Sequence, residues 1–224
     1  MTGLGPRASG LHRLVLVLGL VLVLDHRAHA EPSNETLVYV GLAAAPVDYL
    51  AGVSLHEGSH ALAAKLVGAD VDEYHPFPPG IDPHTHTFRF GWTYVHGLHT
   101  RADRAVFYIA PKITDSVLLG GFAALVYTSA WPRNRYGELA LTVAATGLWV
   151  DFAKDVVLLS PLNDVSQFER ETCLRGWRRV ASRVVYAAAD VGLALVVAHG
   201  YVHTFERPAT TAIPLVLPVL TAAF

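Results

Sequence analysis

The sequence predicts an all-α membrane protein, a polytopic bundle of about four transmembrane helices with a small β-hairpin after the first helix and a short C-terminal apolar segment. Hydrophobic residues make up 52% of the 224 residues, charged residues only 16%, and the mean hydropathy is positive. Several apolar runs approach the roughly 20 residues that a helix needs to cross a bilayer. One such run contains two histidines and a glutamate at helical spacing.

Composition also excludes some classes of protein. The net charge is only −2 and no basic stripe is present, so we expect no nucleic-acid partner. The single cysteine, Cys173, cannot form an internal disulfide. Arginine outnumbers lysine, and alanine, valine and leucine are abundant, as in proteins of GC-rich bacteria. We therefore expect a multi-pass protein of the bacterial inner membrane.

The N-terminus has the pattern of a signal peptide. Arg7 and Arg13 precede an apolar core at 14–24, and the small-x-small sequence Ala28-His29-Ala30 follows. We predict that residues 1–30 are removed, which leaves 31–224 as one membrane-embedded domain. An uncleaved anchor is the alternative, and both interpretations place residue 31 outside the cytoplasm.

The first membrane span is predicted from Leu37 to about Val67, with Pro46 inside it and Gly68 ending it. Residues 70–100 contain too many prolines and glycines for a continuous helix. Within them, 87–90 and 92–95 are rich in aromatic and β-branched residues, so we expect them to form a strand pair around Gly91.

Three further spans are predicted at about 105–130, 136–159 and 180–205. Pro161 ends the second of these, because proline disfavours helix in the residue before it. A soluble stretch follows the span at 136–159. The tail at 212–224 is apolar but broken by prolines, and we expect a partial span or a re-entrant segment.

Basic residues predict the orientation of this bundle. The loop at 165–183 holds the densest arginine cluster, and Arg89, Arg101 and Arg104 lie in the loop at 68–104. The positive-inside rule places both loops in the cytoplasm. The first span then runs from outside to inside, in agreement with the position of residue 31.

The sequence from His56 to His60, His-Glu-Gly-Ser-His, predicts a metal site. Residues four apart share a helix face, so His56 and His60 can bind one ion. Zinc accepts such nitrogens, and a catalytic site needs a third protein ligand and an open position. Glu57 lies beside them as a candidate general base. The alternative is a structural histidine pair, which would be costly inside a membrane.

Asp164 is our candidate for the third ligand, because it follows the cytoplasmic end of the third span and so meets the histidines at one depth. Its alternative role is to satisfy a turn after Asn163. Asp151 and Asp155 are rival ligands four residues apart on that span. They lie deeper in the membrane and could instead pair with Lys154 or Lys112.

The His56–His60 motif in a transmembrane helix resembles the site-2 protease family of intramembrane zinc metalloproteases. The sequence at 161–164, Pro-Leu-Asn-Asp, is similar to the family's aspartate motif, although the order differs and Val165 stands where glycine is expected. Ala110-Pro111 similarly resembles a Gly-Pro in the intervening helix, and the strands after the first span resemble the family's β-hairpin near the substrate. The chain looks like a minimal or divergent member.

The resemblance implies a zinc metalloendopeptidase that hydrolyses peptide bonds in or near transmembrane segments of a membrane-protein substrate. It implies Zn²⁺ at His56, His60 and Asp164, with Glu57 taking the proton of the zinc-activated water. It also implies that the strands at 86–95 hold the unwound substrate by strand addition. A non-catalytic metal-binding or metal-transporting protein of protease-like fold is the alternative, and the oligomeric state is left open.

Other polar residues have simpler interpretations. Five histidines in the loop at 70–100 could form a second metal site, but solvated or turn-capping roles are more common: His75, His84, His86, His96 and His99. His199 and His203 are expected to be structural, at the opposite membrane side from His56. Asp115 is expected to pair with Lys112, and Asp48 is an intramembrane acid that we flag as functional.

Overall fold

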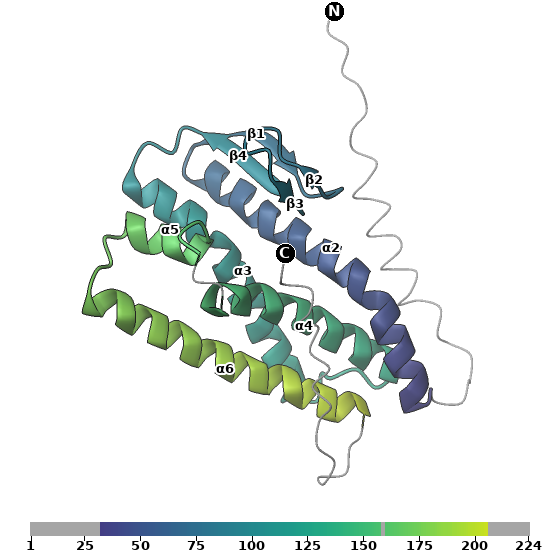
Figure 1. Ribbon diagram of the computed structural model, residues 1–224. Coiled ribbons are helices and arrows are strands. Elements are labelled where there is room, and N and C mark those ends of the chain that lie inside the picture. Colours follow the sequence, from purple (N-terminus) through teal and green to yellow (C-terminus); the bar gives the residue numbers. More distant parts are fainter. Residues whose placement is uncertain (1–31, 158–159, 206–224) are drawn as a thin grey trace, which may run out of the picture. The chain divides into compact units, whose positions relative to one another are not determined.

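The computed structural model describes residues 32–157 and 160–205 (Figure 1). These residues fold into helices, and two small antiparallel sheets lie between the first and second helices along the chain. The predicted signal peptide at 1–30 and the predicted C-terminal segment at 212–224 lie outside the described residues. Three of the described helices, α2, α3 and α6, are long and apolar enough to cross a membrane. The remaining predicted span, α4, is not among them, and it carries the charged residues Asp151, Lys154 and Asp155.

Helix α2 (Asn34–Leu66) matches the first predicted span and continues through Pro46. Gly68 ends it as expected, with a φ of +81° that only glycine adopts at little cost. The Gly68 N–H donates to the Lys65 carbonyl at 3.2 Å and the Ala69 N–H to the Ala64 carbonyl at 2.9 Å. This pair of bonds is a Schellman motif, which turns the chain away from the helix.

Two sheets of two strands each follow α2, and their pairing differs from the prediction. Strand β1 (Asp70–His75) pairs antiparallel with β4 (Trp92–His96), and β2 (Gly80–Ile81) pairs with β3 (Phe88–Arg89). The predicted pairing of 87–90 with 92–95 is wrong. Gly91 alone separates these segments, and a hairpin connection needs at least about two residues.

Asp82 stabilises the loop that joins β2 to β3. Its carboxylate accepts hydrogen bonds from the Thr85 hydroxyl at 2.7 Å and the Tyr94 hydroxyl at 2.5 Å, and it pairs with Arg89 at 3.0 Å. Burial raises the pKa of Asp82, but these hydrogen bonds outweigh burial and hold that pKa below its ordinary value. Burial and the bond to Asp82 raise the pKa of Tyr94 to about 12.

Helix α3 (Arg101–Val126) starts four residues before the predicted span because Thr100 and Asp103 form a capping box. Helix α4 (Arg135–Val157) agrees with the third predicted span. A short helix, α5 (Asp164–Glu171), occupies part of the stretch that we expected to be soluble loop. Helix α6 (Trp177–Phe205) agrees with the last predicted span and extends it at its N-terminus.

Helices α3 and α4 form the centre of the bundle. Both pack on α2 and on α6, and α5 packs on α3 (Figure 1). The main buried cluster joins α3, α4 and α6 through Leu119, Phe122, Ala145 and Val197. Large apolar side chains on the outward faces of α2 and α6 are exposed, among them Leu42, Leu62, Val184 and Leu195. A membrane would cover these faces, as the exposed surface of a spanning helix requires.

Candidate metal centre

His56 and His60 lie one turn apart on α2, on the face that is covered by α3, α4 and α5. Their side chains are 11% and 7% exposed, so both imidazoles are largely out of solvent. The two ring centroids are 5.0 Å apart. The helical spacing of the motif therefore brings both rings to one place, as the sequence predicts.

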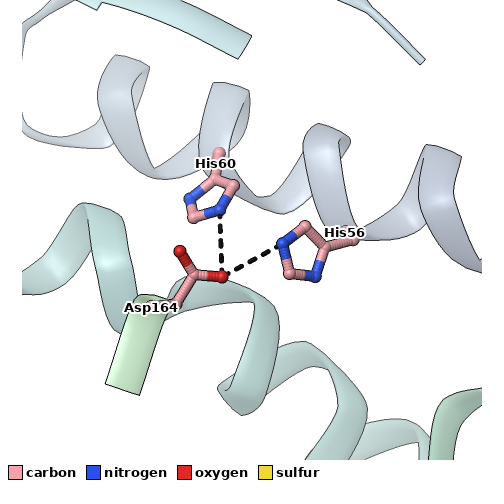
Figure 2. Close-up of side chains that lie close together, drawn as sticks. All are labelled: His56, His60 and Asp164. Atoms are coloured by element: carbon pink, nitrogen blue, oxygen red, sulfur yellow. Dashed lines mark ion pairs between the residues drawn. The ribbon is translucent and has the colours of Figure 1, made fainter. Parts of the chain in front are cut away.

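Asp164 reaches the same place from α5 (Figure 2). Its Oδ2 atom lies 3.1 Å from Nε2 of His56 and 3.5 Å from Nε2 of His60. The turn before α5 is capped by Asn163, whose side-chain oxygen accepts from the Ser166 N–H at 2.8 Å. Asn163 therefore performs the capping role that we considered for Asp164, and the Asp164 carboxylate faces the histidines.

The other nitrogen of each imidazole faces a hydrogen-bond acceptor. Nδ1 of His60 lies 2.9 Å from the Phe107 carbonyl oxygen, and Nδ1 of His56 lies 3.0 Å from Oδ2 of Asp151. A carbonyl oxygen only accepts, so Nδ1 of His60 must carry a proton, and an ionised Asp151 requires the same of His56. In neutral imidazoles this leaves both Nε2 atoms with lone pairs.

Two imidazole lone pairs and a carboxylate oxygen thus converge on one point. Three acceptors at such distances repel one another unless a proton or a metal cation lies between them. Zinc binds nitrogen and oxygen at about 2.0–2.2 Å, so tetrahedral ligand atoms lie about 3.3–3.5 Å apart. The 3.5 Å separation falls in that range and the 3.1 Å separation lies just below it, and one candidate ligand atom from each residue lies within 4.8 Å of the others.

The rival ligands lie elsewhere. Asp151 is on the Nδ1 side of His56, where it also pairs with Lys112 at 2.7 Å and Lys154 at 2.6 Å. Asp155 pairs with Lys112 at 3.2 Å. Hydrogen bonding of the second nitrogen to a carboxylate is the usual way in which a metal-binding histidine is oriented. Asp151 is therefore in the position of a residue that orients His56, not of a third ligand, and Lys112 and Lys154 neutralise its charge.

Glu57 lies where the loop between β3 and β4 comes close to α2. A Cβ atom added at Gly91 would lie 3.0 Å from Cγ of Glu57 and 2.8 Å from Cγ1 of Val53. The Thr93 hydroxyl donates to the Glu57 carbonyl at 3.1 Å. Among the described residues, the Glu57 carboxylate has no hydrogen-bond or ion-pair partner, so it is available to accept a proton.

A buried ion-pair network holds α5, and with it Asp164, in position. Glu169 is 1% exposed and accepts from Nε of Arg183 at 2.7 Å and from Nε of Arg179 at 2.9 Å. Arg183 also donates to the Asp155 carbonyl at 2.8 Å and to the Ser166 hydroxyl at 2.7 Å. These contacts join α4, α5 and α6 behind the aspartate.

The remaining histidines do not build a second centre. Among the described residues, His56, His60 and Asp164 are the one group of three candidate ligands close enough to hold an ion. His75 stacks on Trp92 with ring centroids 4.0 Å apart, and His96 pairs with Asp72. His199 and His203 contact the rings of Tyr127 and Trp131, respectively.

Sequence reasoning missed two features of this site. The role of Asp151 was missed because its spacing from Asp155 suggested a ligand pair, although its position in a span and beside Lys154 was visible. Helix α5 was missed although Asn163 is a good capping residue and an eight-residue amphipathic segment follows it. Asp115 lies 3.6 Å from Lys112, as predicted.

The chain matches no protein-family model, no curated protein and no solved structure.

Proposed function

We propose that this chain is an intramembrane zinc endopeptidase, a minimal or divergent member of the site-2 protease family. The observation that carries the proposal is the convergence of His56, His60 and Asp164 from two helices, with both Nδ1 atoms facing acceptors. Three ligands leave a fourth position, which is the arrangement of catalytic zinc sites.

Each residue has a definite task in this proposal. Zinc, when bound, supplies a Lewis acid that polarises the scissile carbonyl and lowers the pKa of water to about 7. Glu57 accepts a proton from the attacking water at its carboxylate and transfers it to the leaving amine. Asp151 keeps the Nδ1 proton on His56, so that Nε2 presents its lone pair.

The substrate would approach from the side of the sheets. Glu57 faces the loop at Gly91, and Phe88 and Ile81 on the adjacent β3 and β2 are 60% and 61% exposed. A transmembrane substrate must leave its helix before a peptide bond can be attacked. An extended segment beside β3 could pair with it by strand addition, which would present the peptide bond to Glu57.

The proposed location is a bacterial inner membrane, with several spans. Helices α2, α3 and α6 are long and apolar enough to cross it, and α4 packs between them as the partner that carries Asp151. The arginines between 165 and 183 support a cytoplasmic position for α5, and so for the proposed metal centre.

Two measurements test the proposal. Purified wild type should contain about one zinc per chain, and the His56→Ala and Asp164→Ala variants should lose it, because a three-ligand site tolerates no missing ligand. Asp155→Ala is the matched control, since Asp155 contacts Lys112 and not a ligand. Unchanged zinc in Asp164→Ala would reject the site.

The second measurement is cleavage of a transmembrane reporter by Glu57→Gln. We expect this variant to keep its zinc and lose at least about 100-fold in cleavage rate, because general-base catalysis contributes about 10²–10⁴-fold. Full activity in Glu57→Gln would remove the assigned role of Glu57. Replacing 86–95 by a neutral linker without effect on cleavage would remove the role of the strands.

A metal carrier is the second candidate function. It is favoured by carboxylates that continue from His56 into the bundle, namely Asp151, Asp155 and Asp115, and by Asp48, which lies against Gly147 one turn before Asp151. A carrier does not need Glu57. Zinc flux into vesicles that is unchanged in Glu57→Gln, with no cleavage by wild type, would favour the carrier.

A further inference from the structure

A cavity of about 250 Å³ opens where α5 meets the beginning of α6. Four arginine side chains line it: Arg101, Arg170, Arg175 and Arg179. It does not include His56, His60 or Asp164, so it is separate from the metal centre. A basic cavity of this kind has the chemistry of an anion site.

Acidic groups neutralise the cavity only in part. Arg101 pairs with Glu171, which lies outside the lining, at 3.6 Å. Glu169 is the one acidic residue in its lining, and its buried carboxylate is shared between Arg179 and Arg183. Arg170 donates to the Pro161 carbonyl at 3.2 Å, which offsets no charge. Among the described residues, Arg175 makes no ion pair. The lining therefore has excess positive charge and guanidinium N–H groups that an anion can use.

An apolar groove of about 480 Å³ adjoins this cavity along α6. Val156, Val180, Val184 and Ala187 line it, and it shares Ser166 and Arg179 with the basic cavity. Val180 and Val184 are 64% and 62% exposed. A ligand that fits both parts has an anionic end and an apolar chain.

The position on α6 identifies that ligand. Trp177, the first residue of the helix, is 75% exposed, Arg178 and Arg179 follow, and the outward face then becomes apolar. Helices that enter a membrane commonly carry tryptophan and arginine at the interface and apolar side chains beyond it. The arginines place this end at the cytoplasmic leaflet, where anionic lipids are concentrated.

We propose that the basic cavity and the adjoining groove bind one anionic phospholipid, with the phosphate among Arg101, Arg175 and Arg179 and an acyl chain against Val180, Val184 and Ala187. The site is independent of the proposed protease activity. The lipid would lie against α5 through Ser166, on the far side of that helix from its contact with α2 through Asp164.

Cys173 lines the basic cavity and is exposed, and it is the one cysteine of the chain, so it reports occupancy without any mutation. The full-length protein in a neutral detergent would be treated with a maleimide at increasing concentrations of phosphatidylglycerol. A parallel series would use phosphatidylcholine with the same acyl chains. At ten times its Kd, phosphatidylglycerol should slow the reaction of Cys173 about tenfold, because only empty protein reacts. Phosphatidylcholine should leave the rate unchanged.

The Arg175→Gln/Arg179→Gln variant should bind phosphatidylglycerol at least about tenfold more weakly, because it loses two charge-assisted contacts. Lys65→Gln/Arg133→Gln, which removes the same charge at exposed positions elsewhere, should keep wild-type protection. Ala187→Phe tests the groove without touching Glu169, and it should also weaken phosphatidylglycerol binding.

Three results would overturn the proposal. Equal protection by phosphatidylcholine would show that charge does not select the ligand. Protection that survives in both Arg175→Gln/Arg179→Gln and Ala187→Phe would place the lipid elsewhere. Protection by glycerol phosphate at the same concentration as phosphatidylglycerol would show a site for a soluble anion, in which the groove has no part.

Discussion

His60 shows how one backbone contact determines the chemistry of a side chain. The Phe107 carbonyl lies 2.9 Å from Nδ1, and this acceptor requires a proton there. Nε2 then presents a lone pair to Asp164, 3.5 Å away. His56 reaches the same state through Asp151. Contacts with residues outside the candidate ligand set therefore decide which nitrogen of each imidazole presents a lone pair.

The contact between Asp151 and His56 gives the first prediction. Asp151→Asn should lower zinc affinity about 10- to 100-fold, because loss of a carboxylate that orients a ligand histidine has an effect of this size. Zinc affinity would be measured by competition with a chelator. Asp155→Asn is the control, because it also removes a partner of Lys112 but leaves His56 untouched. Equal losses in both variants would mean that Lys112, and not His56, is the affected residue.

Gly91 gives the second prediction. In Gly91→Ala the new methyl group would meet Val53 at 2.8 Å, Glu57 at 3.0 Å and the His75 carbonyl at 3.1 Å. Displacement of Glu57 should lower cleavage at least about tenfold while zinc content is unchanged, since small shifts of a catalytic group have large effects on rate. Gly80→Ala is the control in the same region, because its Cβ would meet one atom, at 3.9 Å. Wild-type cleavage by Gly91→Ala would contradict the prediction.

At the scale of elements, α5 is the decisive helix. Eight residues are too few for a stable isolated helix, so its position depends on tertiary contacts. Arg183 and Arg179 hold it through Glu169, and Arg104 pairs with Glu171, the last residue of the helix, at 3.1 Å. Removing these contacts would move Asp164 away from the histidines without changing any ligand.

Arg183 therefore gives the third prediction. Arg183→Gln should weaken zinc binding and lower stability by about 1.5–3 kcal/mol, because the buried Glu169 loses one of its two arginine partners and keeps Arg179. Zinc affinity and the free energy of unfolding would be measured together. Arg178→Gln is the control on the same helix, where Arg178 lies over the Trp177 ring. If zinc affinity were unchanged in Arg183→Gln, the network would not be what positions Asp164.

The contact of α6 with α3 and α4 gives the fourth prediction. A Cβ atom at Gly200 would lie 2.6 Å from the buried Phe122 ring and 3.2 Å from the Thr142 hydroxyl. Gly200→Ala should therefore destabilise the bundle by about 1–3 kcal/mol through overpacking. Gly192→Ala on the same helix meets no atom within 4 Å and should be neutral or slightly stabilising. Thermal unfolding in detergent would compare the two, and equal midpoints would contradict this packing.

Across the whole molecule, large apolar side chains are exposed on the outer helices while charged side chains are buried beside the apolar core. Large apolar side chains are exposed on α2 and α6, whereas Lys112, Asp115 and Asp155 are buried in the centre of the bundle. This distribution is the reverse of that in a soluble protein, and it suits a protein surrounded by lipid. Charge is also distributed unevenly along the helices, with arginine concentrated around α5 and the beginning of α6.

That asymmetry gives the fifth prediction, on orientation. Cys173 lies in the arginine-rich segment, so the positive-inside rule places it in the cytoplasm. A membrane-impermeant maleimide should label it in inverted membrane vesicles or permeabilised cells and not in intact cells. A cysteine introduced at Arg133, between α3 and α4, should show the opposite pattern. Labelling of Cys173 from outside intact cells would reverse the orientation, and the metal centre with it.

The four long helices and the two histidines of the candidate centre follow from local signals in the sequence. Apolar runs and caps are local signals, and a four-residue spacing on a helix sets the direction of His56 and His60 without any tertiary contact. The strands at 88–89 and 92–96 were also visible locally.

Tertiary packing, in contrast, set which nitrogen of each histidine a carboxylate faces and which strands pair. The sequence favoured Asp164 over Asp151 and Asp155 by depth along the predicted spans. The packing of α4 and α5 against α2 then puts Asp164 at Nε2 of both histidines and Asp151 at Nδ1 of His56. Likewise β4 pairs with β1 and β3 with β2 across intervening chain. The physical reason is the same in both cases: a contact between distant segments depends on how whole elements pack, which short-range spacing does not encode.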